Sequence, residues 1–231
     1  MAKLKKQHMT IHWKAIVQDD SSIPATEATL KEKATLVGRI GLMMLSVGTG
    51  AWRVRNSMNK VSRCLGITCT ADIGLLAISY TCIEGTDTYT QSISLPTTGV
   101  NTHKLMELEL FMKEFPDKVS TYSVKHIHEV LDEIQKLPAN YQAWNLGLAS
   151  ALACGAFTFL LGGGPVEMCC AFLGAGVGNF VRKKMLGHSI SLLANVAVSV
   201  AASCLVYVLT ILLAQQLLSV SAVHQAGYIC A

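Results

Sequence analysis

In the first part of the chain, apolar residues recur every three or four positions, which is the spacing of one face of an α-helix. We therefore predict a helix that begins near Ala25, after Pro24, and runs to about Ser46. A second predicted helix follows Gly48-Thr-Gly50 and ends at Gly66, a residue type that often follows a helix C-terminus. The two apolar stripes consist of Leu30, Val37, Ile40 and Met44, and of Ala51, Val54, Met58, Val61 and Leu65.

Two more helices are predicted between residues 101 and 138. Their apolar stripes consist of Leu105, Leu108, Met112 and Phe115, and of Val124, Ile127, Leu131 and Ile134. Their expected N-caps and ends are Asn101 or Thr102 with Pro116, and Ser120 or Ser123 with Pro138. Between the helix pairs, "ITCTADIGLLAISYTCIEG" is rich in β-branched residues and "TDTYTQSISL" alternates polar with apolar. This predicts two or more strands, with Gly74 as a bulge or the point where one strand becomes two.

The last part of the chain has long apolar runs without charge. A bilayer core needs roughly 20 apolar helical residues, so we predict spans at about 143–161, 165–180 and 189–214, and a partial fourth span at 217–231. Gly162-Gly163-Gly164-Pro165 separates the first two spans, Arg182-Lys183-Lys184 forms a loop after the second, and Gln215-Gln216 ends the third. The predicted fold is an α+β cytosolic domain (25–138) followed by an all-α transmembrane helical bundle (139–231).

Composition supports this division. Hydrophobic residues make up 51% of the chain and charged residues only 15%, against about a quarter in soluble domains. Beyond Ala143 the charged residues are Glu167, Arg182, Lys183 and Lys184. The net charge of +4 is modest and does not suggest nucleic acid. Because cationic loops favour the cytosol, residues 182–184 and the first domain are both predicted to be cytosolic.

The first 24 residues form a basic tail, without the apolar stretch of a secretory signal peptide. Two interpretations stay open for it: a solvated tail, or weak attraction to anionic lipid headgroups. The eight cysteines show no C-x-x-C spacing and fit a reducing cytosol plus a bilayer. His126 and His128 lie two apart on a predicted helix, so we expect them to face solvent rather than a metal. No catalytic residue, metal site or cofactor is predicted.

The stretch "VGTGAWRVRNSMNKVSRCLG" (47–66) resembles a phosphate-binding loop at first sight. A dinucleotide fingerprint requires a third glycine where Arg53 stands and a strand before it, and a Walker motif is absent. We interpret Gly48-Thr-Gly50 as a joint between two helices. Trp52 is expected to face inward with the apolar seam, and Arg53 to pair with a carboxylate or a helix C-terminus.

Three polar residues in the last part are candidates for a transport path: Glu167, Asn179 and Asn195. An ionisable residue at membrane depth suggests function, but Glu167 can equally be an interfacial acid at a helix N-terminus. The two asparagines can line a path or simply bond neighbouring helices. The spans are also rich in glycine, alanine and serine, which favours a closely packed bundle over a simple anchor.

Two segments carry a resemblance to a known family. The first reads Gly48, Thr49, Trp52, Arg53, Val54 and Met58, and the second has Gly162, Gly163 and Gly164 followed by Glu167. Together with the strand region between them, they resemble the N-terminal half of the threonine/serine exporter family, from about Leu36 onward. The resemblance departs at Gly50 and Arg55, near which many members carry acids.

The resemblance implies a component of a bacterial inner-membrane exporter for threonine, serine or a similar small polar metabolite. It also implies that this chain contacts membrane lipid and works with a second membrane module, either a separate subunit or spans beyond Ala231. A homo-oligomer is a further expectation. Because no ATP-binding motif is present, an ion gradient is the expected energy source. Two alternatives stay open: a membrane-anchored cytosolic hydrolase, and a regulatory membrane subunit that does not transport.

Overall fold

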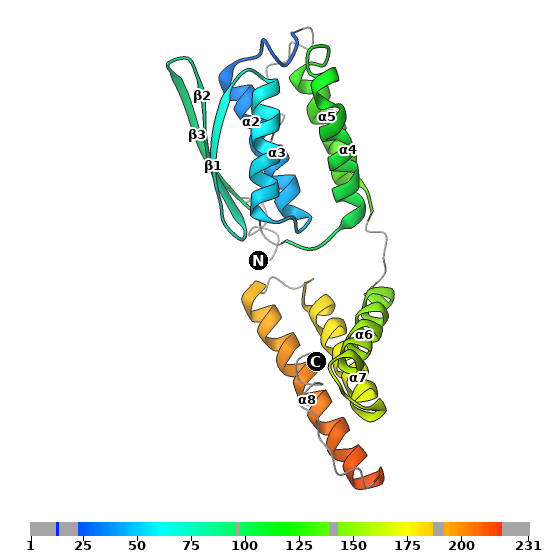
Figure 1. Ribbon diagram of the computed structural model, residues 1–231. Coiled ribbons are helices and arrows are strands. Elements are labelled where there is room, and N and C mark those ends of the chain that lie inside the picture. Colours follow the sequence, from blue (N-terminus) through cyan, green and yellow to red (C-terminus); the bar gives the residue numbers. More distant parts are fainter. Residues whose placement is uncertain (1–12, 14–22, 96–97, 139–142, 187–191, 219–231) are drawn as a thin grey trace. The chain divides into compact units, whose positions relative to one another are not determined.

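The computed structural model describes residues 13, 23–95, 98–138, 143–186 and 192–218. The chain divides into two compact units, Met1–Ala139 and Asn140–Ala231, which we call the front unit and the rear unit. The front unit contains α2 (Leu30–Ser46), α3 (Ala51–Cys64), β1 (Thr68–Ile73), β2 (Ala77–Glu84), β3 (Asp87–Ser94), α4 (Thr102–Lys118) and α5 (Val124–Lys136) (Figure 1). The rear unit contains α6 (Ala143–Leu160), α7 (Pro165–Leu186) and α8 (Leu192–Leu218).

Helix α2 begins later than its apolar pattern indicated, because a capping box sets its N-terminus. The Thr29 hydroxyl accepts a hydrogen bond from the Glu32 N–H (3.4 Å), and the Glu32 carboxylate accepts one from the Thr29 N–H (3.1 Å). The preceding chain is held differently, since the Ala25 N–H donates to the Tyr122 carbonyl (2.9 Å). The predicted start near Ala25 was therefore wrong.

Helix α2 is enclosed on nearly all sides, and not along one stripe. Every residue from Glu32 to Leu45 is buried, because α3, α5, β2 and β3 all contact the helix. Glycine allows this close approach: a Cβ at Gly38 would overlap the side chain of Tyr80. The sequence pattern predicted the helix correctly but not the depth of its burial.

The joint between α2 and α3 is built on Gly48, whose φ of +82° lies in the left-handed region. Residues 98–101 run beside this joint. The Gly99 N–H donates to the Ser46 carbonyl (3.2 Å), and the Asn101 N–H donates to the Val47 carbonyl (3.2 Å). These bonds pair carbonyls at the end of α2 that the helix itself leaves unsatisfied. The prediction of a glycine joint between two helices is confirmed.

The three strands form one antiparallel sheet in the order β1-β2-β3, so the prediction of two or more strands is confirmed. Gly74 lies between β1 and β2, where one apolar run becomes two strands. One face of the sheet belongs to the core of the front unit and carries Cys69, Ile78, Tyr80, Cys82 and Ile93. The other face is rich in serine and threonine, as expected for an antiparallel sheet with one solvated face.

The register of this sheet can be tested through two cysteines. Cys69 on β1 lies directly opposite Cys82 on β2, and both side chains are buried. A hydrogen bond between the thiols lowers the pKa of Cys69, whereas that bond and burial raise the pKa of Cys82. Opposite residues in antiparallel strands have Cα atoms about 4.5–5.5 Å apart, within the range of a disulfide.

We expect mild oxidation with diamide to join Cys69 and Cys82, the two thiols giving up two electrons and two protons to the reagent. Peptide mapping by mass spectrometry would detect the cross-linked peptide. Cys64, which has no cysteine opposite it, serves as the internal control and should stay a thiol. A shift of the register by one residue would place Thr81 opposite Cys69, and this cross-link would then not form.

Helix α4 continues past Pro116 to Lys118, so the prediction that Pro116 ends the helix was wrong. Proline lacks the N–H that would bond the carbonyl four residues earlier. In this structure the Lys60 ammonium donates to that carbonyl, on Met112, at 2.8 Å. The predicted N-caps Asn101 of α4 and Ser123 of α5 are confirmed, since each side chain accepts a backbone N–H of the first turn.

In the rear unit, α6 matches the first predicted span, and a glycine turn connects it to α7. Gly162 has a φ of +90°, and the Gly163 N–H donates to the Thr158 carbonyl (3.0 Å). Helix α7 runs through residues 182–184, so the predicted basic loop is helical instead. Helix α8 likewise includes Gln215 and Gln216, which were expected to end it. The predicted fourth span lies almost entirely outside the described residues.

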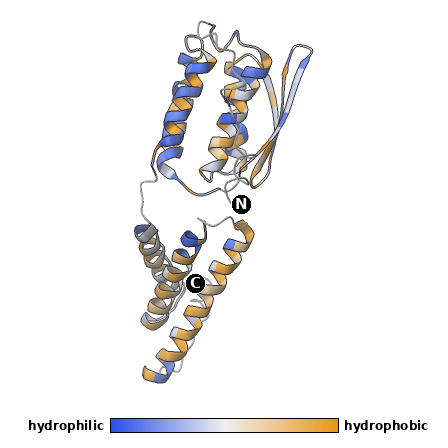
Figure 2. Ribbon diagram, turned by 180° about the vertical axis from the view of Figure 1, so that it is seen from behind, coloured by the Kyte–Doolittle hydropathy of each residue, from blue (hydrophilic) through white to orange (hydrophobic). Residues whose placement is uncertain are grey.

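Apolar residues cover α8 along its length (Figure 2). Among the described helices, Leu192–Leu217 is long and apolar enough to cross a membrane, and Trp144–Leu160 is apolar but shorter. Helix α7 carries four charged residues, Glu167, Arg182, Lys183 and Lys184. The described part of the chain thus contains one clear candidate span, and a bundle of three spans is a proposal to which we return.

Candidate functional site

A row of polar side chains lies buried on α8. Asn195, Ser199, Ser203 and Tyr207 follow one another at intervals of four residues and are 2%, 6%, 3% and 0% exposed. We call these four residues the α8 polar stripe. A spacing of four keeps residues on one side of a helix, so an otherwise apolar helix has a single polar side. That side is turned into the protein rather than to the surroundings.

Two glycines of α7 face this stripe and allow the helices to approach closely. A Cβ on Gly178 would lie 2.8 Å from the Ser203 Cβ and 3.0 Å from the Ser199 carbonyl oxygen. A Cβ on Gly174 would lie 2.9 Å from the Ser203 carbonyl oxygen. Any side chain larger than hydrogen would force the helices apart. We call this contact between α7 and α8 the polar seam.

Two side chains of the stripe donate to backbone carbonyls. The Asn195 amide donates to the Arg182 carbonyl of α7 (3.4 Å), and the Ser199 hydroxyl donates to the Val196 carbonyl of its own helix (2.9 Å). The amide oxygen of Asn195 is buried and has no protein partner among the described residues. If α7 and α8 separate slightly, these groups can bond a polar solute. The amide oxygen accepts hydrogen bonds, and the hydroxyls both donate and accept them.

Of the predicted path residues, Glu167 lies at the start of α7, whereas Asn195 of α8 contacts Arg182 near the end of α7. Glu167 is 4% exposed and stands in the first turn of the helix. A Cβ on Gly164 would come within 2.8 Å of its carboxylate, so this group folds over the start of its own helix. A helix N-terminus favours negative charge. Glu167 and Arg182 are 15 residues apart along α7, which corresponds to about 22 Å.

Asn179 belongs to a different contact. Its amide donates to the Ser150 hydroxyl and so joins α7 to α6. The structure therefore does not bring the three predicted residues into one site. Glu167 lies at the start of α7, Asn195 of α8 contacts the other end of α7, and Asn179 faces α6. Sequence reasoning missed Ser199, Ser203 and Tyr207. The four-residue spacing from Asn195 was the signal that could have identified them.

Residues 48–58, the first of the two segments that carry the family resemblance (the signature segment), differ from their predicted arrangement at Ala51 and Trp52, which are both exposed. Val54 and Met58 are buried, as the apolar stripe of this helix predicted. Trp52 is 69% exposed, so the expectation that it faces inward was wrong. Trp52 is the second residue of α3, before the first buried residue of the helix, Val54. Arg53 pairs with the Glu109 carboxylate of α4 (3.1 Å), which confirms the prediction of a carboxylate partner.

A second polar cluster lies inside the front unit, around Arg39 of α2. The guanidinium is 1% exposed and donates to the His128 ring nitrogen Nδ1 (2.8 Å) and to the His128 carbonyl (3.0 Å). It also pairs with Asp132 and donates to the Gln135 side-chain oxygen (3.4 Å). The Trp13 ring lies 5.8 Å from the guanidinium. His128 is 1% exposed, so the prediction that it faces solvent was wrong.

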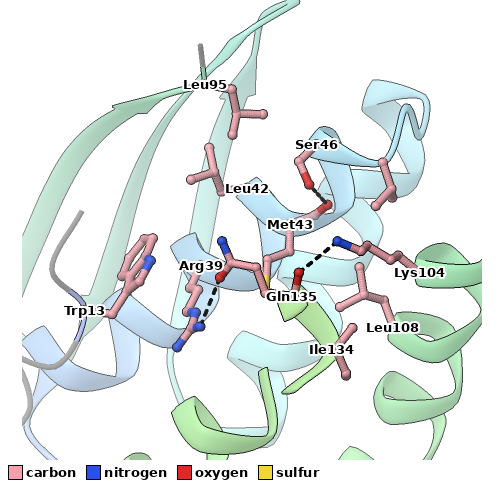
Figure 3. A pocket seen from close by; sticks show the side chains of 11 residues that line it. Trp13, Arg39, Leu42, Met43, Ser46, Leu95, Lys104, Leu108, Ile134 and Gln135 are labelled. Carbon is pink, nitrogen blue, oxygen red and sulfur yellow. Dashed lines mark hydrogen bonds between the residues drawn. The ribbon is translucent and has the colours of Figure 1, made fainter. Parts of the chain in front are cut away.

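A cavity of about 90 Å³ adjoins this cluster (Figure 3). Arg39 and Lys104 approach Gln135 from two sides, since the Lys104 ammonium donates to the Gln135 carbonyl (2.8 Å). Apolar side chains, including Leu42, Met43 and Leu108, line the rest. The volume corresponds to about three water molecules and is far below that of ordinary cofactor pockets. The cavity can hold water or a small anion.

The burial of His128 predicts a pH dependence. Burial, and then the charge of Arg39, lower its pKa to about 4, whereas an unfolded histidine has a pKa of about 6.5. The unfolded chain therefore binds this proton more readily. The contribution of neutral His128 is complete above about pH 6.5 and is lost as the pH falls toward 4, by roughly 3 kcal/mol.

We expect the stability of the front unit to decrease between pH 6.5 and pH 4, measured by hydrogen exchange of the α2 and α5 amides in the full chain. His128→Gln should reduce this decrease. His126→Gln is the matched control, because His126 is exposed, and it should leave the decrease unchanged. Equal pH profiles for the wild type and His128→Gln would show that His128 is not the titrating group.

Among the described residues, no group of three or more His, Cys, Asp or Glu side chains can hold a metal ion. Comparison with protein families gives one match: the family model described as "Putative threonine/serine exporter" matches residues 35–230. No curated protein and no solved structure matches the chain. The matched range includes both the signature segment at the α2–α3 joint and the polar seam.

Proposed function

Because the chain belongs to the threonine/serine exporter family, which its match over residues 35–230 shows, we propose that it is an integral membrane component of a secondary exporter. Its substrates are threonine, serine or a similar small polar metabolite. The polar seam carries the proposal: an apolar helix long enough to cross a membrane has one buried polar side, facing glycines. Polar groups at membrane depth are costly and usually belong to a substrate path.

The proposed path follows the α8 polar stripe. Serine and threonine carry a hydroxyl, a carboxylate and an ammonium, and the stripe offers hydroxyls and amide groups that bond any of these. Glu167 lies at one end of α7 and Asn195 lies opposite its other end, so a solute moving along the seam would pass from one to the other. Asn179 supports the path indirectly by holding α6 against α7.

The proposed topology has α6, α7 and α8 crossing a bacterial inner membrane and the front unit in the cytosol. The cations at residues 182–184 support a cytosolic position for that end of α7, because cationic segments favour the cytosol. A second membrane module, as a separate subunit or a further part of a longer chain, completes the transporter, and an ion gradient drives it. The front unit gates the path or binds substrate.

Counterflow of labelled threonine and serine in proteoliposomes, with and without a co-expressed second module, tests the proposal. The double variant Ser199→Ala and Ser203→Ala should reduce the flux, because it removes two hydroxyls from the stripe without adding volume. Thr210→Val is the matched control: Thr210 is on α8 and also bonds carbonyls of its own helix, but it does not belong to the polar stripe. No flux with any candidate module would exclude transport and leave the regulatory or hydrolase alternatives.

A further inference from the structure

One end of the front unit carries unusually exposed apolar side chains. Trp52, Leu75, Val100 and Met106 are 69%, 63%, 83% and 59% exposed, more than any other large apolar side chain in the described part of this unit. We call this set the apolar end. Single exposed apolar residues are common, but several gathered together usually mark an interaction site.

Three separate parts of the chain bring these residues to the same end. Trp52 follows the α2–α3 joint, and Val100 belongs to the segment that is hydrogen-bonded beside that joint. Leu75 is in the β1–β2 turn, and Met106 is in the first turns of α4. Figure 1 shows the joint, this turn and the start of α4 at one end of the front unit.

The chain leaves the front unit at this same end. The Lys104 ammonium, in the first turn of α4, donates to the Gln135 carbonyl in the last turn of α5 (2.8 Å). The end of α5 therefore lies beside the start of α4. Residues 137–142 separate α5 from α6, and a chain of that length spans at most about 25 Å. If α6 enters a membrane, the apolar end is tethered near the membrane surface.

The chemistry of this end fits a lipid surface. Tryptophan is favoured at membrane interfaces because its ring is apolar and its N–H bonds headgroups. The Arg53 guanidinium lies 6.0 Å from the Trp52 ring, at the edge of the apolar group. The charged residues of the adjoining segments are the cations Arg53, Arg55, Lys104 and Lys136 and the acids Asp72, Glu107 and Glu109, and Glu109 is paired with Arg53. The small positive excess suits anionic headgroups.

We propose that the apolar end of the front unit docks on the lipid surface of the membrane into which the rear unit inserts, with Trp52, Leu75 and Val100 at the headgroup–acyl boundary. This inference rests on the membrane topology of the proposed function, but not on its substrate. Docking explains why Trp52 stands outside the core while Val54 and Met58, on the same helix, are buried. It also places the α2–α3 joint directly at the membrane.

Tryptophan fluorescence of the full chain in lipid nanodiscs tests the docking. The variant with Trp13→Phe and Trp144→Phe retains Trp52 alone, and phospholipids brominated near the headgroup quench only indoles that reach the boundary. We expect brominated lipid to quench Trp52 strongly and aqueous acrylamide to quench it weakly. Strong acrylamide quenching without lipid quenching would overturn the proposal. Protection from both quenchers would also overturn it, because another protein surface would then cover Trp52.

Two matched variants complete the experiment. A chain that retains Trp13 alone should escape lipid quenching, because Trp13 packs against Arg39 and His128 inside the front unit. A chain that retains Trp144 alone reports on the start of α6. Quenching of Trp144 without quenching of Trp52 would overturn docking while the membrane topology stands. If neither residue is quenched by lipid, the topology in the proposed function fails together with the docking.

Discussion

Replacing Arg39 by leucine is expected to destabilise the front unit by about 3 kcal/mol, a large part of the roughly 5–15 kcal/mol that stabilises a typical domain. The guanidinium is 1% exposed and is held by His128, Asp132 and Gln135. Leucine would remove the Arg39 partner of the Asp132 carboxylate, whose side chain is 26% exposed, and the donor to the buried ring nitrogen and the carbonyl of His128. Loss of these buried hydrogen-bond and ion-pair partners is the main cost. Hydrogen exchange of the α2 amides in the full chain would measure the effect.

The same substitution at Arg53 is the matched control. Arg53 also pairs with a glutamate, but its side chain is 46% exposed and that of Glu109 is 51% exposed. Exposed ion pairs contribute at most about 1 kcal/mol, so Arg53→Leu should change exchange rates little. If Arg39→Leu and Arg53→Leu destabilise α2 equally, the buried cluster does not stabilise the front unit in the way we infer.

The Arg39 cluster shows where sequence reasoning stops. His128, Asp132 and Gln135 lie four and three residues apart, which places them on one face of α5. The sequence pattern contained that face, but His128 was predicted to face solvent because the helix was considered without its neighbours. Only the packing of α2 against α5 shows that the face covers a buried arginine. Burial of α2 on nearly all sides could not be predicted either, since it depends on four neighbouring elements and on Gly38.

In the rear unit, the apolar runs and the glycine turn predicted the existence and order of the three described helices. Their ends were less predictable. Residues 182–184 were assigned to a loop because of their charge, yet lysine and arginine extend helices readily when their side chains reach a polar surface. Gln215 was taken as an end for a similar reason. Charge and polarity indicate where a helix leaves an apolar environment, not where the helix stops.

The arrangement of the three candidate path residues could not be predicted from the sequence. Glu167, Asn179 and Asn195 were selected because they are the most polar residues in the apolar region. Their positions depend on which helix each one faces, and that requires the angle of α7 between its two neighbours. The α8 polar stripe could have been predicted, because its regular spacing of four residues is visible in the sequence. Small hydroxyl residues attract less notice than charged ones, although glycines on the facing helix make them significant.

Under the proposed function, replacing Gly178 by valine is expected to force α7 and α8 apart and reduce threonine export by about tenfold. A Cβ at Gly178 would already lie 3.0 Å from the Ser199 carbonyl oxygen and 2.8 Å from the Ser203 Cβ. The nearest atoms belong to the backbone or its first side-chain carbon, so they cannot rotate away, and α8 has to move. Overpacking of this kind costs about 1–3 kcal/mol, and 1.4 kcal/mol already corresponds to tenfold in a population.

Counterflow in proteoliposomes measures the export, and thermal unfolding in detergent measures the packing of the rear unit. Gly147→Val on α6 is the control, because a Cβ at Gly147 would have no neighbour within 4 Å. Loss of export with Gly178→Val and normal export with Gly147→Val would place the functional contact between α7 and α8. Normal export by a Gly178→Val protein would contradict it: a seam that can be forced open without consequence does not conduct the solute, and the path would then have to follow a different helix face.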